Sequence, residues 1–206
     1  MGTVVKAKRI ALGSGKLYCV EESESVKLSS NMEISAVLEL IKQNAVEDNI
    51  LGRIKNGATF NYSATSYTEK DDFNEVSKTK ITDETASISA GFITFDLSMI
   101  NKIVATAQYS SDESGNEMVK LGGIQNDKGK KYVIIFVHED KADGNIAVLI
   151  RGKNTAAIAL AFANGAGTLT SPTFTAEPFD ADGVSSIILN YKQASAQQAS
   201  EGQTEA

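Results

Sequence analysis

The chain lacks most of the side chains on which catalytic and metal sites are built. Its 206 residues include one cysteine, Cys19, one histidine, His138, and no tryptophan. A single cysteine excludes a disulfide within the chain and a cysteine-based zinc site. No apolar run approaches the roughly 18 residues that a membrane-spanning helix needs. Residues 1–6 also lack the apolar segment of a signal peptide, so we expect a protein that is made in the cytoplasm and enters no membrane.

Positive charge is in the minority. The chain has 20 basic and 26 acidic residues, a net charge of −6, and its basic clusters at 6–9 and 128–131 are short. A protein that grips nucleic acid along the backbone usually carries a basic stripe, and none is visible here. Hydrophobic residues make up 42% of the chain, which is enough for a folded core. We expect one domain over residues 1–192, with an N-terminal arm of about 50 residues, and a polar tail over 193–206.

Alternation of side chains predicts strands along most of the chain. In residues 58–65, which follow the turn signal Asn56-Gly57, Phe60, Tyr62 and Ala64 point one way, and Phe60 and Tyr62 are expected to pack into the core. The opposite face is wholly polar and uncharged; it consists of Thr59, Asn61, Ser63 and Thr65. We expect further strands at 16–21, 87–95, 131–138, 146–151, 155–163, 173–177 and 185–191. The pairs 131–138 with 146–151, and 173–177 with 185–191, are expected to form hairpins.

Two helices are predicted between these strands. Ser30 and Glu33 have the spacing of a capping box, and the apolar residues Ile34, Val37, Leu38 and Ile41 follow at helical spacing. Asp96 is expected to cap a second helix whose apolar stripe contains Leu97, Ile100, Ile103, Val104 and Ala107. Together these patterns predict a mainly β fold: a β-sandwich or half-open barrel of about seven or eight strands with one flanking α-helix.

Residues 66–85 are highly charged and show no clear periodicity. They include Glu69, Lys70, Asp71, Asp72, Phe73 and Glu75. We predict a long loop here that is mobile in the monomer, and a loop of this length in a compact domain usually serves a function.

The candidates for catalysis are weak. His138 is followed by acids but has no nucleophile motif to serve, which favours the end of a buried strand. The segment Gly13-Ser14-Gly15-Lys16 lacks the spacing of a phosphate-binding loop. The carboxylates Glu69, Asp71 and Asp72 are better explained by a solvated loop than by a paired-carboxylate site. We therefore expect that the chain is not an enzyme and needs no cofactor.

Two groups of side-chain oxygens have the residue types of a calcium site. They are Asp140, Asp143 and Asn145, and then Asp180 and Asp182. Neither group is followed by the glutamate that closes a calcium-binding loop, and both lie where a hairpin turn favours Asp-Gly. We expect turns, and no metal.

Two stretches carry a resemblance to a known family. Residues 51–62 read LGRIKNGATFNY, and the triplets KDD at 70–72 and TDE at 82–84 follow. Residues 173–180 read TFTAEPFD. These motifs, with the order of strands and helix between them, resemble the major tail proteins (tail tube proteins) of tailed bacteriophages with non-contractile tails, over roughly residues 50–192.

The resemblance implies a fold and an assembly. Such proteins are β-sandwiches with a flanking helix; they form hexameric rings whose strands join an inner β-barrel, and the rings stack into a helical tube. It implies a location in the virion tail, assembly in the bacterial cytoplasm, and no cofactor. The implied partners are other copies of the chain and the tail terminator, tape-measure and tail-tip proteins, while phage DNA passes through without specific binding.

Within this picture the residues acquire roles. The face of Thr59, Asn61, Ser63 and Thr65 is expected to line the lumen, and the loop from Glu69 to Glu75 to carry contacts between rings. An acidic subunit suits a channel along which DNA must slide. Two alternatives stay open: a ring protein of a contractile injection or type VI-like tube, and a monomeric β-sandwich binding module that uses Tyr62, Tyr67 and Phe73.

Overall fold

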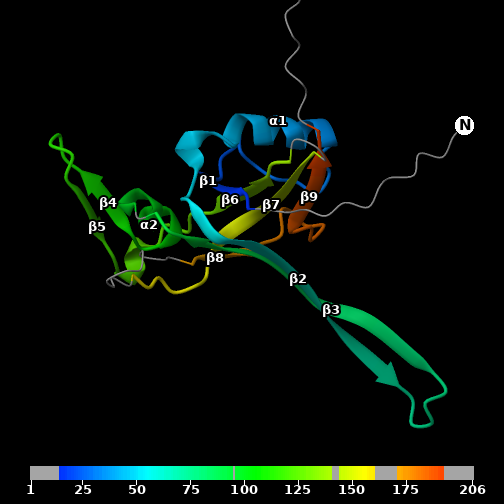
Figure 1. Cartoon of the computed structure of the whole chain (residues 1–206). Coiled ribbons are helices and arrows are strands. Elements are labelled where there is room, and N and C mark those ends of the chain that lie inside the picture. Colours follow the sequence, from blue (N-terminus) through cyan, green and yellow to red (C-terminus); the bar gives the residue numbers. More distant parts are fainter. Residues whose placement is uncertain (1–13, 95, 141–143, 161–170, 193–206) are drawn as a thin grey trace, which may run out of the picture.

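The computed structural model describes residues 14–94, 96–140, 144–160 and 171–192. These residues form a mainly β fold of antiparallel sheets, as predicted, with nine strands and two α-helices (Figure 1). The strands are β1 (Lys16–Glu21), β2 (Ile54–Lys70), β3 (Ser77–Phe92), β4 (Gln108–Ser111), β5 (Glu117–Lys120), β6 (Tyr132–His138), β7 (Asn145–Asn154), β8 (Thr173–Ala176) and β9 (Ser186–Tyr191). The α-helices are α1 (Ile34–Asn44) and α2 (Leu97–Ile103), and single 3₁₀ turns lie at Glu47–Asn49 and Ile124–Asn126.

One antiparallel sheet organises the molecule. Its order is β1-β6-β7-β8-β3-β2, and β9 joins the free side of β7. The sheet curls back on itself, because the chain just before β2 bonds to β1: the Leu51 N–H donates to the Leu17 carbonyl at 2.9 Å. The result is a half-open barrel, in agreement with the sequence.

The sheet separates two apolar cores. Inside the curl, β1, β3, β6 and β8 contribute Leu17, Phe92, Ile134 and Phe174, all fully buried. Outside it, α1 packs on Val133, Ile135 and Leu149. Successive residues of β6 therefore serve opposite cores, which confirms the prediction of a strand buried on both faces.

Helix α1 lies where its periodicity placed it, but its predicted cap is wrong. Val37, Leu40 and Ile41 form the buried stripe, whereas Ile34, which was predicted to belong to it, is 65% exposed at the start of the helix and Leu38 is only partly buried. Glu33 precedes the helix without a side-chain capping bond. The Ser30 hydroxyl instead lies 2.8 Å from an Asp180 carboxylate oxygen and 2.9 Å from an Asp182 carboxylate oxygen, and donates its single proton between them. Residues that are distant in the sequence therefore bind Ser30, in place of the expected bond at the start of the helix.

Helix α2 confirms its predicted cap, since Asp96 Oδ1 accepts from the Ser98 N–H at 2.7 Å. The helix ends at Ile103, so Val104 and Ala107 lie beyond it. The hairpin of β4 and β5 was missed; Asp112 closes it by accepting from the N–H groups of Ser114 and Asn116.

Two further predictions for the C-terminal half are wrong. Residues 155–160 form no strand, and 161–163 lie outside the described residues. Strands β8 and β9 exist but do not pair with each other, because β9 pairs the first half of β7 and β8 pairs its last residues and β3. Each of the two strands pairs with other strands of the main sheet, and they do not form a hairpin with each other.

Candidate assembly site

The long hairpin of β2 and β3 projects far beyond the rest of the molecule (Figure 1). Its register runs from Ile54 opposite Phe92 to Lys70 opposite Ser77. Every residue from 61 to 85 is exposed, and we call this segment the arm. The predicted loop over 66–85 is therefore wrong, because only residues 71–76 form a turn. The arm has no buried face, so its sequence lacks the apolar alternation by which strands are recognised.

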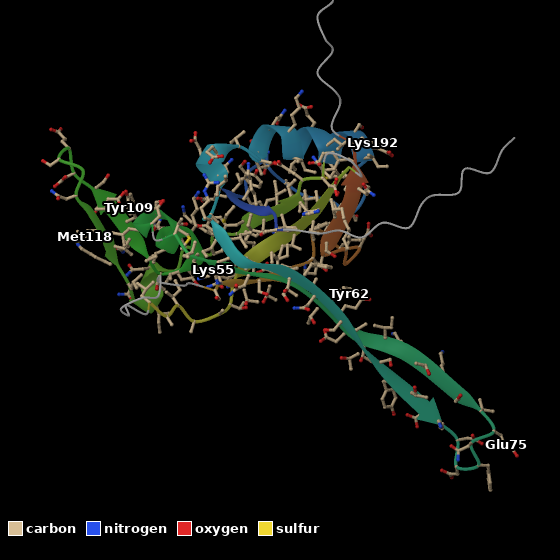
Figure 2. All side chains as sticks on the ribbon, viewed as in Figure 1. Lys55, Tyr62, Glu75, Tyr109, Met118 and Lys192 are labelled. Carbon is tan, nitrogen blue, oxygen red and sulfur yellow. The ribbon has the colours of Figure 1, made fainter. Side chains whose placement is uncertain are left out.

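The tip of the arm has a defined conformation. The Asp71 N–H donates to the Val76 carbonyl at 3.1 Å, and the Val76 N–H donates to Asp71 Oδ1 at 2.9 Å. Asn74 adopts a φ of 57°, a left-handed conformation that asparagine tolerates. Asp71 therefore holds the turn, while the Phe73 side chain is 82% exposed. Figure 2 shows Glu75 at this end of the molecule.

The register assembles one continuous polar face, which we call the polar face. It contains the predicted residues of β2, and β3 adds residues directly opposite them: Thr59, Asn61, Ser63 and Thr65 face Ser89, Ser87, Thr85 and Asp83. The hydroxyls of Ser63 and Thr85 are 2.7 Å apart. The β3 half was missed, although Ser87 and Ser89 alternate with Ile88 and Ala90, because the alternation alone does not give the register.

The opposite face changes from buried to exposed along the arm. Phe60 is partly buried and packs against the inner core. Tyr62 was expected to pack there as well, but it is 54% exposed. Its hydroxyl donates to Glu84 at 2.7 Å, and this hydrogen bond raises the pKa of Tyr62 above its ordinary value. The buried core ends at Ala86, which lies opposite Tyr62 in the register. The alternation of apolar residues along β2 therefore continues past the last residue that packs against the core.

Two bulges shape the hairpin. Asn56 and Gly57, predicted as a turn before the strand, lie within β2 at a register shift and have φ values of 68° and 80°. A second shift follows Thr65, where the Thr82 hydroxyl donates to the Thr65 carbonyl at 3.2 Å. Bulges strengthen the local twist and re-aim a strand. Beyond the second one the polar face becomes charged, with Glu69 opposite Lys78.

Both edges of the arm are open. Among the described residues β2 pairs only with β3, and β3 pairs with β8 only over residues 87–89. Residues 56–68 contain neither a charge nor a proline. Natural sheets usually protect exposed edges with such residues, and an unprotected edge is a template for pairing with another chain. The β2 edge of the arm is thus a site whose backbone can bond to a second strand, whereas the β3 edge carries the charged residues Lys78, Lys80, Asp83 and Glu84.

The remaining candidates lie elsewhere. His138 ends β6 and is 6% exposed, as its predicted place at the end of a buried strand requires. Its Nδ1 lies 2.9 Å from the Ser14 carbonyl oxygen. Gly15 packs so closely on the Phe136 ring that a Cβ atom would lie 2.6 Å from it, so the glycine is explained by packing. Cys19 is buried inside the curl, and burial raises the pKa of its thiol to about 12.

The acidic candidates form turns. Asp180 accepts from the backbone N–H and the hydroxyl of Ser30, and these bonds hold its pKa below the ordinary value. Asn145 Oδ1 accepts from the Asp140 N–H at 3.1 Å, while Asp143 lies outside the described residues. In the part of the chain that the structure describes, no group of three His, Cys, Asp or Glu side chains could hold a metal ion. The helices of that part are too short or too polar to cross a membrane.

Comparison with known proteins adds no relative. A scan against protein-family models gives no match, and a search of curated proteins finds no similar sequence.

Proposed function

We propose that the chain is the structural subunit of a phage tail tube, in which hexameric rings stack into a hollow conduit for the phage genome. The observation that carries this proposal is the arm, which has two open edges and one continuous polar face. The motifs at 51–62, 70–72, 82–84 and 173–180 support the same conclusion through their resemblance to major tail proteins.

The open edges argue for association with other copies. A two-stranded hairpin with no packed face is marginally stable in water. Arms of neighbouring subunits that lie side by side would pair the open backbone groups of β2 and β3 and so stabilise each other. Closing such a sheet into a ring removes every edge, which an open array of copies could not do. The arm therefore favours a closed ring over a simple dimer.

The polar face suits the wall of a channel for DNA. Its hydroxyl and amide groups, such as those of Ser63 and Asn61, hold water and carry no positive charge. Ammonium groups would displace counterions from the phosphates and bind the DNA. Up to the second bulge the wall has none of them and lets the duplex slide, and the net charge of −6 acts in the same direction.

The alternatives fare differently. A ring protein of a contractile or type VI-like tube would use the same arm in the same way, so it remains a variant of this proposal. A monomeric binding module would need its aromatic side chains in a row. Tyr62 and Tyr67 stand on opposite faces of the two-stranded ribbon, because they are five positions apart along β2 and alternate side chains face opposite ways. This geometry argues against a single aromatic platform.

The proposal is tested with the purified full chain over a wide range of protein concentration. Sedimentation velocity is expected to show a shift from monomer to rings or tubes, and negative-stain microscopy should show hollow particles with a stain-filled centre. A species that stays monomeric at the highest concentration would exclude the proposal and favour the binding module.

A further inference from the structure

A basic pocket lies on the side of the molecule away from the arm. It is a cavity of about 310 Å³ between α2, the start of β4, the start of β6 and the end of β7. Four lysines line it, Lys102, Lys128, Lys130 and Lys153, and no carboxylate does. In a chain with a net charge of −6 this is a local reversal of sign.

Most of this charge has no carboxylate partner among the described residues. Lys130 bonds to Glu21 at 2.7 Å. Within the described ranges, no carboxylate lies within 4.0 Å of the ammonium groups of Lys102, Lys128 or Lys153. The pocket therefore presents three free cations to whatever enters it.

The walls of the pocket are partly apolar. Ile103, Tyr109 and Tyr132 contribute to its lining between the lysines. A cavity of roughly 150 Å³ already admits a benzene ring. The pocket is thus large enough for one aromatic side chain surrounded by acidic groups.

The tip of the arm has the complementary chemistry. Residues 71–76 read DDFNEV, with three carboxylates and no basic residue. Asp71 is used to hold the turn, which leaves Asp72 and Glu75 beside the exposed ring of Phe73. The tip and the pocket lie at opposite ends of the molecule, as the positions of Glu75 and Tyr109 show (Figure 2). A tip cannot reach its own pocket in this arrangement, but it can reach that of another copy.

We propose that the basic pocket of one subunit is the socket for the arm tip of another, with Phe73 in the cavity and Asp72 and Glu75 against the lysines. The inference rests on the proposed function and specifies one contact within the assembly. A head-to-tail contact of this kind joins two different surfaces and so propagates from copy to copy into rings or filaments. Its charged part also selects the partner, since like charges placed opposite each other disfavour a wrong pairing.

The test reverses the charges on each side in the full chain. We expect Lys128→Glu with Lys153→Glu to raise the concentration needed for half-assembly by about tenfold or more, which corresponds to about 1.4 kcal/mol per contact. Asp72→Lys with Glu75→Lys should have a similar effect. All four changes in one chain restore opposite signs across the contact and should restore assembly. Sedimentation velocity measures each concentration, and circular dichroism with thermal melting verifies the fold.

Controls separate this contact from a general charge effect. Lys27→Glu with Lys42→Glu makes the same change in net charge at two exposed positions near α1 and should leave assembly unchanged. If a charge-reversed variant loses its fold, milder changes replace it: Lys128→Gln with Lys153→Gln on the pocket, and Phe73→Ala on the tip. Each should raise the concentration needed for half-assembly, by less than the charge reversals do.

The outcomes are distinct. A wild-type chain that never assembles overturns the proposed function, and the docking contact with it. If the wild-type chain assembles, but needs the same concentration for half-assembly as Lys128→Glu with Lys153→Glu, only the docking contact is overturned. Loss of assembly in both reversed variants without recovery in the combined one also overturns it, because the two surfaces would then act on different partners.

Discussion

Ser63 and Thr85 face each other across the arm with their hydroxyl oxygens 2.7 Å apart. This pair lies at the middle of a face that is polar on both strands, exposed over residues 61–85 and half-buried at Ser87 and Ser89. Cross-strand hydroxyl pairs of this kind stabilise a sheet modestly, by about 0.2–1 kcal/mol. Their larger consequence is that the polar surface of β2 is continued by β3, so one chain offers a two-stranded polar strip.

Lysines on the polar face should change DNA binding without changing the fold. Asn61→Lys with Ser63→Lys places two exposed cations there, and such surface changes shift stability by only about 0.5 kcal/mol. Assembled tubes of the variant should retain duplex DNA at low salt and release it at high salt, because phosphate contacts depend on counterion release. Co-sedimentation of DNA with tubes measures this. The neutral change Asn61→Gln with Ser63→Thr is the control, and a lysine variant that melts as early as Phe60→Ala would show that the faces are wrongly assigned.

The cost of removing an aromatic ring should fall along the hairpin. Phe174 is fully buried, Phe60 is partly buried against the inner core, and Tyr62 is mostly exposed. We expect Phe174→Ala to lower the free energy of unfolding by about 3–5 kcal/mol. Phe60→Ala should cost roughly 1–3 kcal/mol and Tyr62→Ala under about 1 kcal/mol, in proportion to the apolar area lost. Urea titration of the monomer measures all three, and equal losses at Phe60 and Tyr62 would contradict the position at which the core ends.

Shortening the arm should separate folding from assembly. Ser66 and Ile81 are register partners, so residues 67–80 can be replaced by Asn-Gly, which closes a two-residue hairpin. The excised residues are all exposed, and the melting temperature of the monomer should hardly change. Rings and tubes should be lost in sedimentation velocity. Normal tubes from this variant would show that the distal arm makes no contact needed for assembly.

The tie between Asp180 and Ser30 should weaken in acid. Hydrogen bonds from Ser30 hold the pKa of Asp180 below its ordinary value of 3.8, so the folded state favours the charged carboxylate. This contribution is present above the unfolded-state pKa and is lost as the pH falls through the lower, folded-state value. Asp180→Asn should therefore reduce the urea midpoint at pH 7, and the difference from wild type should shrink below about pH 4. A difference that stays constant from pH 7 to pH 3 would contradict this origin.

Cys19 should report opening of the sheet. It is the only cysteine, it is buried inside the curl, and its pKa is raised to about 12, so almost no thiolate forms in the folded state. Since the thiolate is the reactive form, the native chain should react with a thiol reagent only through unfolding, at a rate that rises with denaturant. Labelling within seconds in the absence of denaturant would show that β1 detaches readily from β6.

Local patterns in the sequence predicted much of the fold. The strands at β1, β6 and β7, the stripe of α1 and the Asp96 cap of α2 depend on residues within a few positions of one another. Periodicity and capping chemistry act over that range. The half of the polar face on β2 was predicted for the same reason, since alternate side chains of a strand must face opposite ways.

Only the tertiary structure decided the features that depend on distant partners. Ser30 binds Asp180, 150 residues away, in place of its local cap. The strands β8 and β9 complete the edges of β7 and not a hairpin of their own. The arm was not predicted because it has no buried face, so its sequence lacks apolar alternation and resembles a loop. The basic pocket, too, joins lysines from three distant parts of the chain, and no local pattern records which residues the fold brings together.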